Sequence, residues 1–329
     1  MRWLVLLLAL LVLPLAHAAD PVVPPPAPSL ASARELYCAR RDAEARSAFE
    51  LLLAADPANH EAVYHLGRLA LRRDDWKTAS THYQHCTKLD PTNALYWADL
   101  GEAYGKLAGQ AGLFQQLGLA RKCHLALEKA VELAPDNLDY RHGLIEFYEQ
   151  APSIAGGGRD KALAQAAELT RRDPFNGTLV TGGIQAHARN WSEAEVAFLA
   201  AIKLRPNALE PIASLGLLYA DQGRYPDAFA QFDRLLTLDP DHLAGLYQLG
   251  RVAALSGQRL ADGSAALRRY LGKGNLPAEL PRPHHAHYRL GQIMVHQGDA
   301  AAAKAAFEAS IQLDPKFKEA AAELKKLQL

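Results

Sequence analysis

Small, apolar and aromatic residues recur along most of the chain with a period of about 34 residues. Five periods open on a leucine–glycine pair, at Leu66-Gly67, Leu100-Gly101, Leu215-Gly216, Leu249-Gly250 and Leu290-Gly291. Four periods carry an alanine with an aromatic residue four positions later, at Ala79 and Tyr83, Ala194 and Phe198, Ala228 and Phe232, and Ala303 and Phe307. Residues four apart share one face of an α-helix. The pattern therefore predicts two packed helices in each period.

Prolines mark the ends of the periods, because proline cannot continue the hydrogen-bond ladder of a helix. They stand at Pro57, Pro91, Pro135, Pro174, Pro206, Pro240 and Pro315. The long last interval holds two periods, one of them closed without a proline. We therefore expect eight helix pairs over residues 30–329, ending near 57, 91, 135, 174, 206, 240, 275 and 315. A capping helix, 318–329, follows them.

This arrangement resembles the tetratricopeptide repeat (TPR) over nearly the whole of residues 30–329. The resemblance implies an all-α fold, a right-handed superhelix in which stacked helix pairs supply the core. We expect the small residues to let the two helices of a pair approach closely, and the aromatic residues to fill the gap to the next pair. TPR proteins generally bind peptides or partner helices in a concave groove lined by the first helices of their pairs.

The N-terminal 29 residues have the pattern of an export signal and a spacer. Residues 1–18 combine a basic Arg2, an apolar run and the ending Ala16-His17-Ala18, which is typical of a secretory signal peptide. The apolar run is shorter than the roughly 20 residues that span a membrane. Residues 19–29 are rich in proline and predict a stiff linker. We expect a periplasmic or secreted protein, cleaved after about Ala18, with no transmembrane segment afterwards.

Charge and cysteine content exclude several classes of function. The 36 basic and 36 acidic residues balance, so the chain lacks the basic excess of a nucleic-acid-binding protein. The three cysteines, Cys38, Cys86 and Cys123, are too far apart for a Cys-x-x-Cys motif. We expect them to be small buried apolar residues rather than a disulfide or a metal site.

No stretch of the sequence matches a catalytic or metal-binding motif well. The stretch HEAVYH at 60–65 resembles a zinc-protease motif, but its histidines are five apart and point away from each other on a helix. Two other histidine groups, 82–85 and 284–287, could share a metal but have no fixed acidic ligand beside them. No nucleophile and base stand at a spacing that is typical of a catalytic pair. We therefore predict no catalytic residue, no metal and no cofactor.

The third and fourth periods are longer than the others, by ten and five residues, at the turn between their two helices. These turns share one edge of a TPR stack, so both enlargements should lie side by side. Leu113, Phe114 and Leu117 would project beyond the ordinary packing. An uncovered apolar tip suggests a contact site. The third and fourth periods together resemble exported bacterial TPR proteins, and more distantly the periplasmic TPR partners of TRAP-type solute transporters.

The second enlargement contains three glycines before a helix, Gly156, Gly157 and Gly158, followed by Arg159 and Lys161. Glycine N–H groups at a helix start can bind an anion. The spacing fits no phosphate-binding motif, however, and Asp160 places a negative charge there. We favour a structural loop that covers Phe114. The alternative is a module that binds an apolar or anionic small ligand at this edge, as in a transporter-associated TPR protein.

The repeat register also places residues in the predicted concave groove. Aromatic and basic side chains are expected at its two ends: Tyr64, Arg68 and Arg72, then Tyr247, Arg251, His285 and Tyr288. Acidic side chains are expected at its centre: Glu102, Asp139, Glu146 and Glu149. Aromatic and arginine residues often anchor interfaces. The sequence predicts a non-enzymatic scaffold of the cell envelope that binds a partner peptide or helix.

Overall fold

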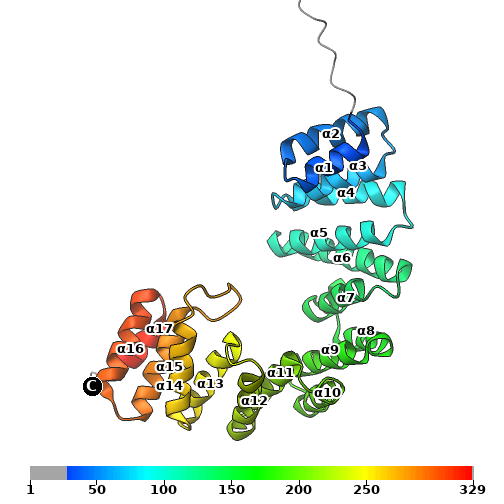
Figure 1. Cartoon of the computed structure of the whole chain (residues 1–329). Coiled ribbons are helices and arrows are strands. Elements are labelled where there is room, and N and C mark those ends of the chain that lie inside the picture. The colour runs from blue at the N-terminus through cyan, green and yellow to red at the C-terminus, as the bar shows by residue number, and fades with distance from the viewer. Residues whose placement is uncertain (1–27, 328–329) are drawn as a thin grey trace, which may run out of the picture. The chain divides into compact units, whose positions relative to one another are not determined.

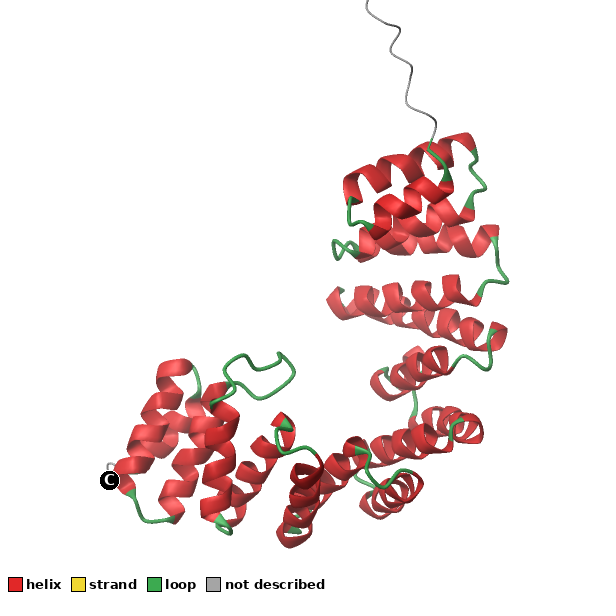
Figure 2. Ribbon diagram, viewed as in Figure 1, coloured by secondary structure: helices red, strands yellow, loops and turns green. Residues whose placement is uncertain are grey.

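The computed structural model describes residues 28–327, which form seventeen α-helices and one short 3-10 helix (Figure 1). No strand occurs among these residues, as Figure 2 shows. The prediction of an all-α chain is therefore confirmed. The predicted signal peptide and most of the proline-rich linker lie outside the described residues.

The α-helices form eight consecutive pairs and a final single helix. The first helices of the pairs are α1 (Leu30–Cys38), α3 (His60–Leu71), α5 (Ala94–Gln110), α7 (Leu138–Gln150), α9 (Pro174–His187), α11 (Leu209–Asp221), α13 (Leu243–Ser256) and α15 (Pro283–His296). The second helices are α2 (Asp42–Ala55), α4 (Trp76–Leu89), α6 (Leu113–Leu133), α8 (Arg159–Arg172), α10 (Trp191–Leu204), α12 (Tyr225–Leu238), α14 (Leu260–Leu271) and α16 (Ala300–Leu313). The 3-10 helix η1 (Ser153–Ala155) precedes α8, and α17 (Lys318–Lys326) follows the last pair.

The helices group into two compact units, Met1–Asp90 and Pro91–Leu329. The first unit contains α1 to α4, with a core around Phe49, Leu66 and Leu69. The second unit contains α5 to α17, and a continuous apolar core runs through α9 to α17. Within each unit the second helix of a pair packs against its own partner and, where another pair follows, against the first helix of that pair.

The helix ends follow from the residues beside the prolines. Asp56, Asp90 and Asp239 each precede a proline or its turn and adopt φ values of −137°, −135° and −135°. A residue before proline avoids the helical region, so the helix stops there. The next helix often begins at an Asn or Asp whose side chain accepts a backbone N–H. Asn59, for example, accepts from the N–H of Ala62 at 3.0 Å.

The aromatic residue of each pattern lies over the glycine of its own pair. Tyr83 and Phe307 are fully buried. A methyl group added to Gly67 would lie 2.6 Å from the ring of Tyr83, and one added to Gly291 would lie 2.3 Å from the ring of Phe307. The prediction that small residues allow close approach is therefore confirmed. These rings therefore fill the space that the missing glycine side chain leaves inside the pair, and their contact with the next pair stays a prediction.

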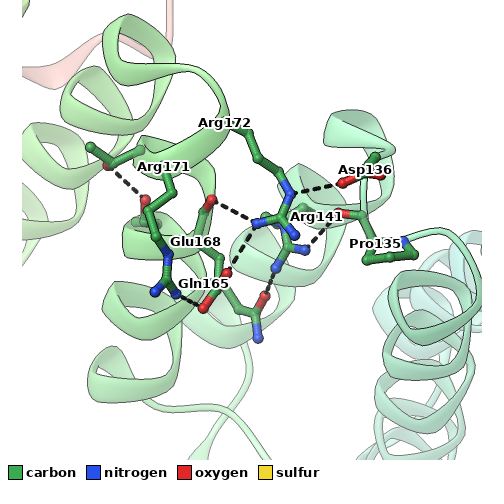
Figure 3. Close-up of polar contacts among 9 residues, drawn as sticks. Pro135, Asp136, Arg141, Gln165, Glu168, Arg171 and Arg172 are labelled. Atoms are coloured by element: carbon green, nitrogen blue, oxygen red, sulfur yellow. Dashed lines mark hydrogen bonds and ion pairs between the residues drawn. The ribbon is translucent and has the colours of Figure 1, made fainter.

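A buried arginine joins α7 to α8 in the second unit (Figure 3). The Nη2 group of Arg141 donates to the carbonyl oxygen of Pro135 at 2.8 Å, and its Nη1 group donates to Oε1 of Gln165. Arg172 extends the network, since its Nε group donates to Asp136 at 3.1 Å. The two hydrogen bonds of Arg141 hold the turn before α7 against α8 and satisfy two nitrogens of the buried guanidinium, whose Nε atom has no hydrogen-bond partner among the described residues.

Replacing Arg141 by lysine should therefore destabilise the second unit by about 1–2 kcal/mol, because an ammonium cannot reach both acceptors in the same plane. The matched control is Arg171→Lys on α8, where the side chain is largely exposed and pairs with Glu168. That change should stay within about 0.5 kcal/mol. Urea unfolding followed by circular dichroism measures both. Equal effects of the two substitutions would contradict the structural role of Arg141.

Candidate functional site

A cavity of about 980 Å³ opens between α5, α6, α7 and the loop after α7, all within the second unit. Cys123 and Leu127 of α6 line its floor. Gly105 and Gly109 of α5 and Gly143 of α7 line its walls. The cavity exists because these glycines carry no side chain that could fill the space between the helices.

The ten extra residues of the third pair lengthen both of its helices. α5 has 17 residues and α6 has 21, whereas α3 and α4 have 12 and 14. The extra turns carry Leu113 and Phe114 at the mouth of the cavity, with exposed fractions of 79% and 98%. Leu117, one turn further on, also lines the cavity and is half-buried. The mouth of the cavity is thus an exposed apolar surface.

The glycine loop does not cover Phe114, so that expectation is wrong. The loop packs instead against α6 about two to three turns beyond it, which is a separation of roughly 15 Å along the helix axis. There Nε of Arg121 donates to the carbonyl oxygen of Ile154 at 3.3 Å. A methyl group on Gly156 would lie 2.5 Å from Nδ1 of His124. Ile154 is itself 67% exposed and adds to the apolar mouth.

The N–H groups of the three glycines are used by carbonyl oxygens of the loop and of α7. The N–H groups of Gly156, Gly157 and Gly158 donate to the carbonyl oxygens of Ser153, Pro152 and Tyr148, at 3.0, 3.3 and 2.8 Å. The ammonium group of Lys161 donates to the carbonyl oxygen of Gly156 at 2.9 Å. Arg159 is exposed at the start of α8. The proposed anion site therefore lacks its three glycine donors, and the geometry does not support it.

The glycines are required by the tightness of this loop. Gly156 has a φ of +105°, in the left-handed region that side chains disfavour. A methyl group on Gly157 would lie 1.9 Å from the carbonyl oxygen of Ala151. The run of glycines thus has a structural cause, which is the sharp reversal between α7 and α8.

Four acidic residues line the two facing walls of the cavity: Asp99 and Glu102 on α5, and Asp139 and Glu146 on α7. Among the lining residues that the structure describes, Lys106 is the one basic side chain. Asp99 and Asp139 both act on Tyr140: burial first, and then these two carboxylates, raise the pKa of that phenol above its ordinary value. The electrostatic environment of the cavity is therefore acidic.

The predicted acidic centre is thus largely gathered at the cavity. Glu102, Asp139 and Glu146 line it. Glu149 does not line the cavity. Its carboxylate pairs with Nδ1 of His187 on α9 at 3.0 Å. Sequence reasoning did not single out the wall glycines, although Gly101, Gly105 and Gly109 stand four residues apart and share one face of α5.

The predicted groove residues of the first unit are engaged in contacts inside that unit. The guanidinium of Arg72 lies 3.6 Å from the ring centre of Tyr37 and forms an ion pair with Asp42. Arg72 therefore holds α3 against the first helix pair rather than presenting a free charge. Arg68 lies beside Tyr64, with Nη1 at 3.4 Å from the phenol oxygen.

The predicted groove residues of the second unit are also largely used in packing. Tyr247 is only 6% exposed, and its ring lies 5.5 Å from that of Tyr270, so its assignment to an open groove is wrong. Its neighbour on the same helix face, Arg251, pairs with Asp221 at 3.2 Å.

His285 and Tyr288 lie at the last pair, where α17 follows. Their rings pack edge-on against Phe317, with centres 5.0 and 5.3 Å apart. Both side chains are half-buried in this contact. None of the seven predicted aromatic and basic groove residues lines the cavity.

Comparison with known proteins identifies the helix pairs. Models of the tetratricopeptide repeat match residues 30–94, 214–275 and 284–317. The chain therefore contains tetratricopeptide repeats in these three segments. The matched segments leave out residues 95–213, which contain the cavity and the glycine loop.

Solved TPR structures have the same fold. A tetratricopeptide repeat protein from Parabacteroides merdae superposes with a TM-score of 0.54 at 14% identity, over 82% of this chain and 99% of that one. A subunit of the Cut9–Hcn1 assembly of the APC/C gives a TM-score of 0.53 at 15% identity, over 91% of this chain and 55% of that one. These likenesses confirm the predicted fold class, a TPR superhelix.

A curated relative by sequence is superkiller protein 3 of Schizosaccharomyces pombe, which is 26% identical over 188 residues. The match takes in 55% of this TPR chain but only 13% of that protein. This chain therefore corresponds to a small part of its relative.

Two further predictions can be compared with the TPR structure. None of the helices within residues 28–327 is both long and apolar enough to cross a membrane. Cys86 and Cys123 are buried, as predicted, and burial raises the pKa of the Cys123 thiol to about 12. Cys38 is exposed at the end of α1, so its predicted burial is wrong.

Proposed function

We propose that this TPR protein is a non-enzymatic scaffold of the cell envelope that binds another protein at the cavity between α5, α6 and α7. The observation that carries the proposal is the exposure of Phe114 and Leu113 at the mouth of the cavity. A phenylalanine ring gains about 2 kcal/mol when it leaves water, so a partner that covers it gains affinity. TPR folds commonly mediate protein–protein interaction, and the export signal pattern of residues 1–18 supports the location.

Photo-cross-linking in the intact source cell tests the proposal. p-Benzoylphenylalanine replaces Phe114, and in a matched variant it replaces Leu125, which lies on the same helix, is 65% exposed and does not line the cavity. We expect one dominant protein to be joined at position 114 and not at position 125. Phe114→Ser should weaken capture of that protein by about ten-fold or more, as for a central interface aromatic.

A small-ligand module is the second candidate, because the volume of about 980 Å³ lies at the upper end of the range of small-molecule sites. The acidic walls favour an apolar or cationic compound over the anion considered from the sequence. Native mass spectrometry of gently purified protein separates the two candidates. If a small molecule is retained and no protein is cross-linked at position 114, the scaffold proposal is rejected in favour of a small-ligand-binding module.

A further inference from the structure

We infer that the partner segment held in the cavity is a short amphipathic helix whose polar side is basic. This inference rests on the proposed function and adds the chemistry of the partner. The cavity combines an apolar end with acidic walls. The apolar end favours an apolar face on the occupant, and the acidic walls favour basic side chains.

The exposed apolar side chains lie at one end of the cavity, and the carboxylates extend from the other end along its walls. α5 runs from Asp99, near its start, to Gly109, next to the apolar tip. α7 runs in the same sense, from Asp139 near its start to Gln150 beside the loop. The exposed apolar residues Leu113, Phe114 and Ile154 all belong to the tip and the loop. An occupant therefore meets the carboxylates of Asp99 and Asp139 at one end, those of Glu102 and Glu146 along the walls, and exposed apolar side chains at the other end.

The dimensions of the walls favour a helix. The eleven residues from Asp99 to Gly109 span about 15 Å of helix, which is close to three turns. Gly105 and Gly109 on one wall are exposed, and Gly109 has no heavy atom within 4 Å of the place where a side chain would begin. Small residues let a second helix approach a helix backbone closely. A partner helix of about ten residues can therefore lie along α5.

The wall charges favour basic residues on that helix. Glu102, Asp139 and Glu146 are exposed at the walls. Their carboxylates therefore face the solvent from which a partner would approach. Lys106 offsets only part of this charge. Complementary charge steers encounter and rejects partners of the wrong sign. An acidic or phosphorylated segment would meet repulsion here, and the three glycine N–H groups of the loop are already used by carbonyl oxygens.

Three designed helical peptides test the charge preference. They share one apolar face of leucine and phenylalanine and carry lysine, glutamine or glutamate on the polar face. Fluorescence anisotropy with the purified full chain measures their dissociation constants. We expect the lysine peptide to bind about ten-fold more tightly than the glutamine peptide at low salt, and the glutamate peptide to bind most weakly. Equal binding of the lysine and glutamate peptides would overturn the inference.

Variants of the walls separate charge from apolar contact. The double variant Glu102→Gln/Glu146→Gln removes two of the four wall carboxylates and should clearly reduce the preference for the lysine peptide over the glutamine peptide. Both substituted residues are exposed, and their replacement keeps the side-chain shape. Glu132→Gln on α6, whose carboxylate pairs with Lys129 outside the cavity, is the matched control and should keep the preference. Retention of the full preference by the double variant would place the basic site elsewhere and overturn the inference.

The same double variant, combined with p-benzoylphenylalanine at position 114, distinguishes this inference from the proposed function. If the cross-linked protein persists at full yield in the double variant, the partner exists but is not recognised by charge, and only the inference fails. If no protein is joined to position 114 even with the native carboxylates, the proposed function itself fails. A strong reduction in the double variant, with normal yield for Glu132→Gln, supports both.

Discussion

Gly177→Ala is expected to destabilise the second unit by about 3 kcal/mol, the largest effect of any single methyl group that we predict. Gly177 is buried on α9 where this helix crosses α8. A methyl group there would lie 2.3 Å from the backbone N and Cα atoms of Thr170. Backbone atoms cannot rotate away as a side chain can, so α8 and α9 must separate to admit the methyl group.

The matched control lies six residues further along the same helix. A methyl group on Gly183 would have no heavy atom within 4 Å. Gly183→Ala should therefore stabilise the protein by about 0.5–1 kcal/mol, because alanine loses less backbone entropy than glycine in a helix. Urea unfolding and hydrogen exchange of the α8 and α9 amides measure both changes. Similar free energies of unfolding for the two variants would contradict the close packing of α8 against α9 at Gly177.

Acidification from pH 6.5 to pH 4 is expected to destabilise the first unit by about 2 kcal/mol through His65. The imidazole of His65 stacks on Phe49 at 4.7 Å, and its Nδ1 atom is buried with no hydrogen-bond partner among the described residues. Burial, and then the positive charges of Arg34, Arg68 and Arg72, lower the pKa of His65 from 6.5 to about 4.

The sign follows from where the proton binds. As the pH falls below 6.5, the histidine of the unfolded chain takes up a proton while the folded histidine stays neutral until about pH 4. The unfolded state is therefore favoured progressively between these values, and the loss levels off below pH 4. The upper part of this window, above about pH 5, lies above the range in which most carboxylates titrate.

The comparison of the native chain with His65→Phe isolates this contribution, because phenylalanine keeps the stacked ring and cannot take up a proton. Hydrogen exchange of the α3 amides, measured across this pH range, reports on the first unit alone. The variant should lose about 2 kcal/mol less than the native chain between pH 6.5 and pH 4. An equal loss in both would show that other groups control the acid sensitivity of this unit.

The sequence by itself determined the fold, because TPR packing is local. The glycine, alanine and aromatic positions of a pair lie within a few tens of residues of one another, and each pair contacts only its neighbours. The pattern of Gly67, Ala79 and Tyr83 therefore predicts a helix pair without knowledge of the rest of the chain. The prolines predict the helix ends for the same reason, since their effect on the backbone extends over one or two residues.

The tertiary structure alone decided which of the candidate residues are available to a partner. Tyr247 and Arg72 have the residue types and spacing of groove residues, yet Tyr247 is buried and Arg72 is paired with Asp42. The glycine loop has the composition of an anion site, yet the N–H groups of its three glycines are used by carbonyl oxygens of the loop and of α7. Whether a residue is available to a partner depends on contacts between different helices and turns, and these contacts cannot be inferred from the spacing of residues along the sequence. The cavity itself arises in this way, from glycines on α5 and α7 that the helix packing leaves uncovered.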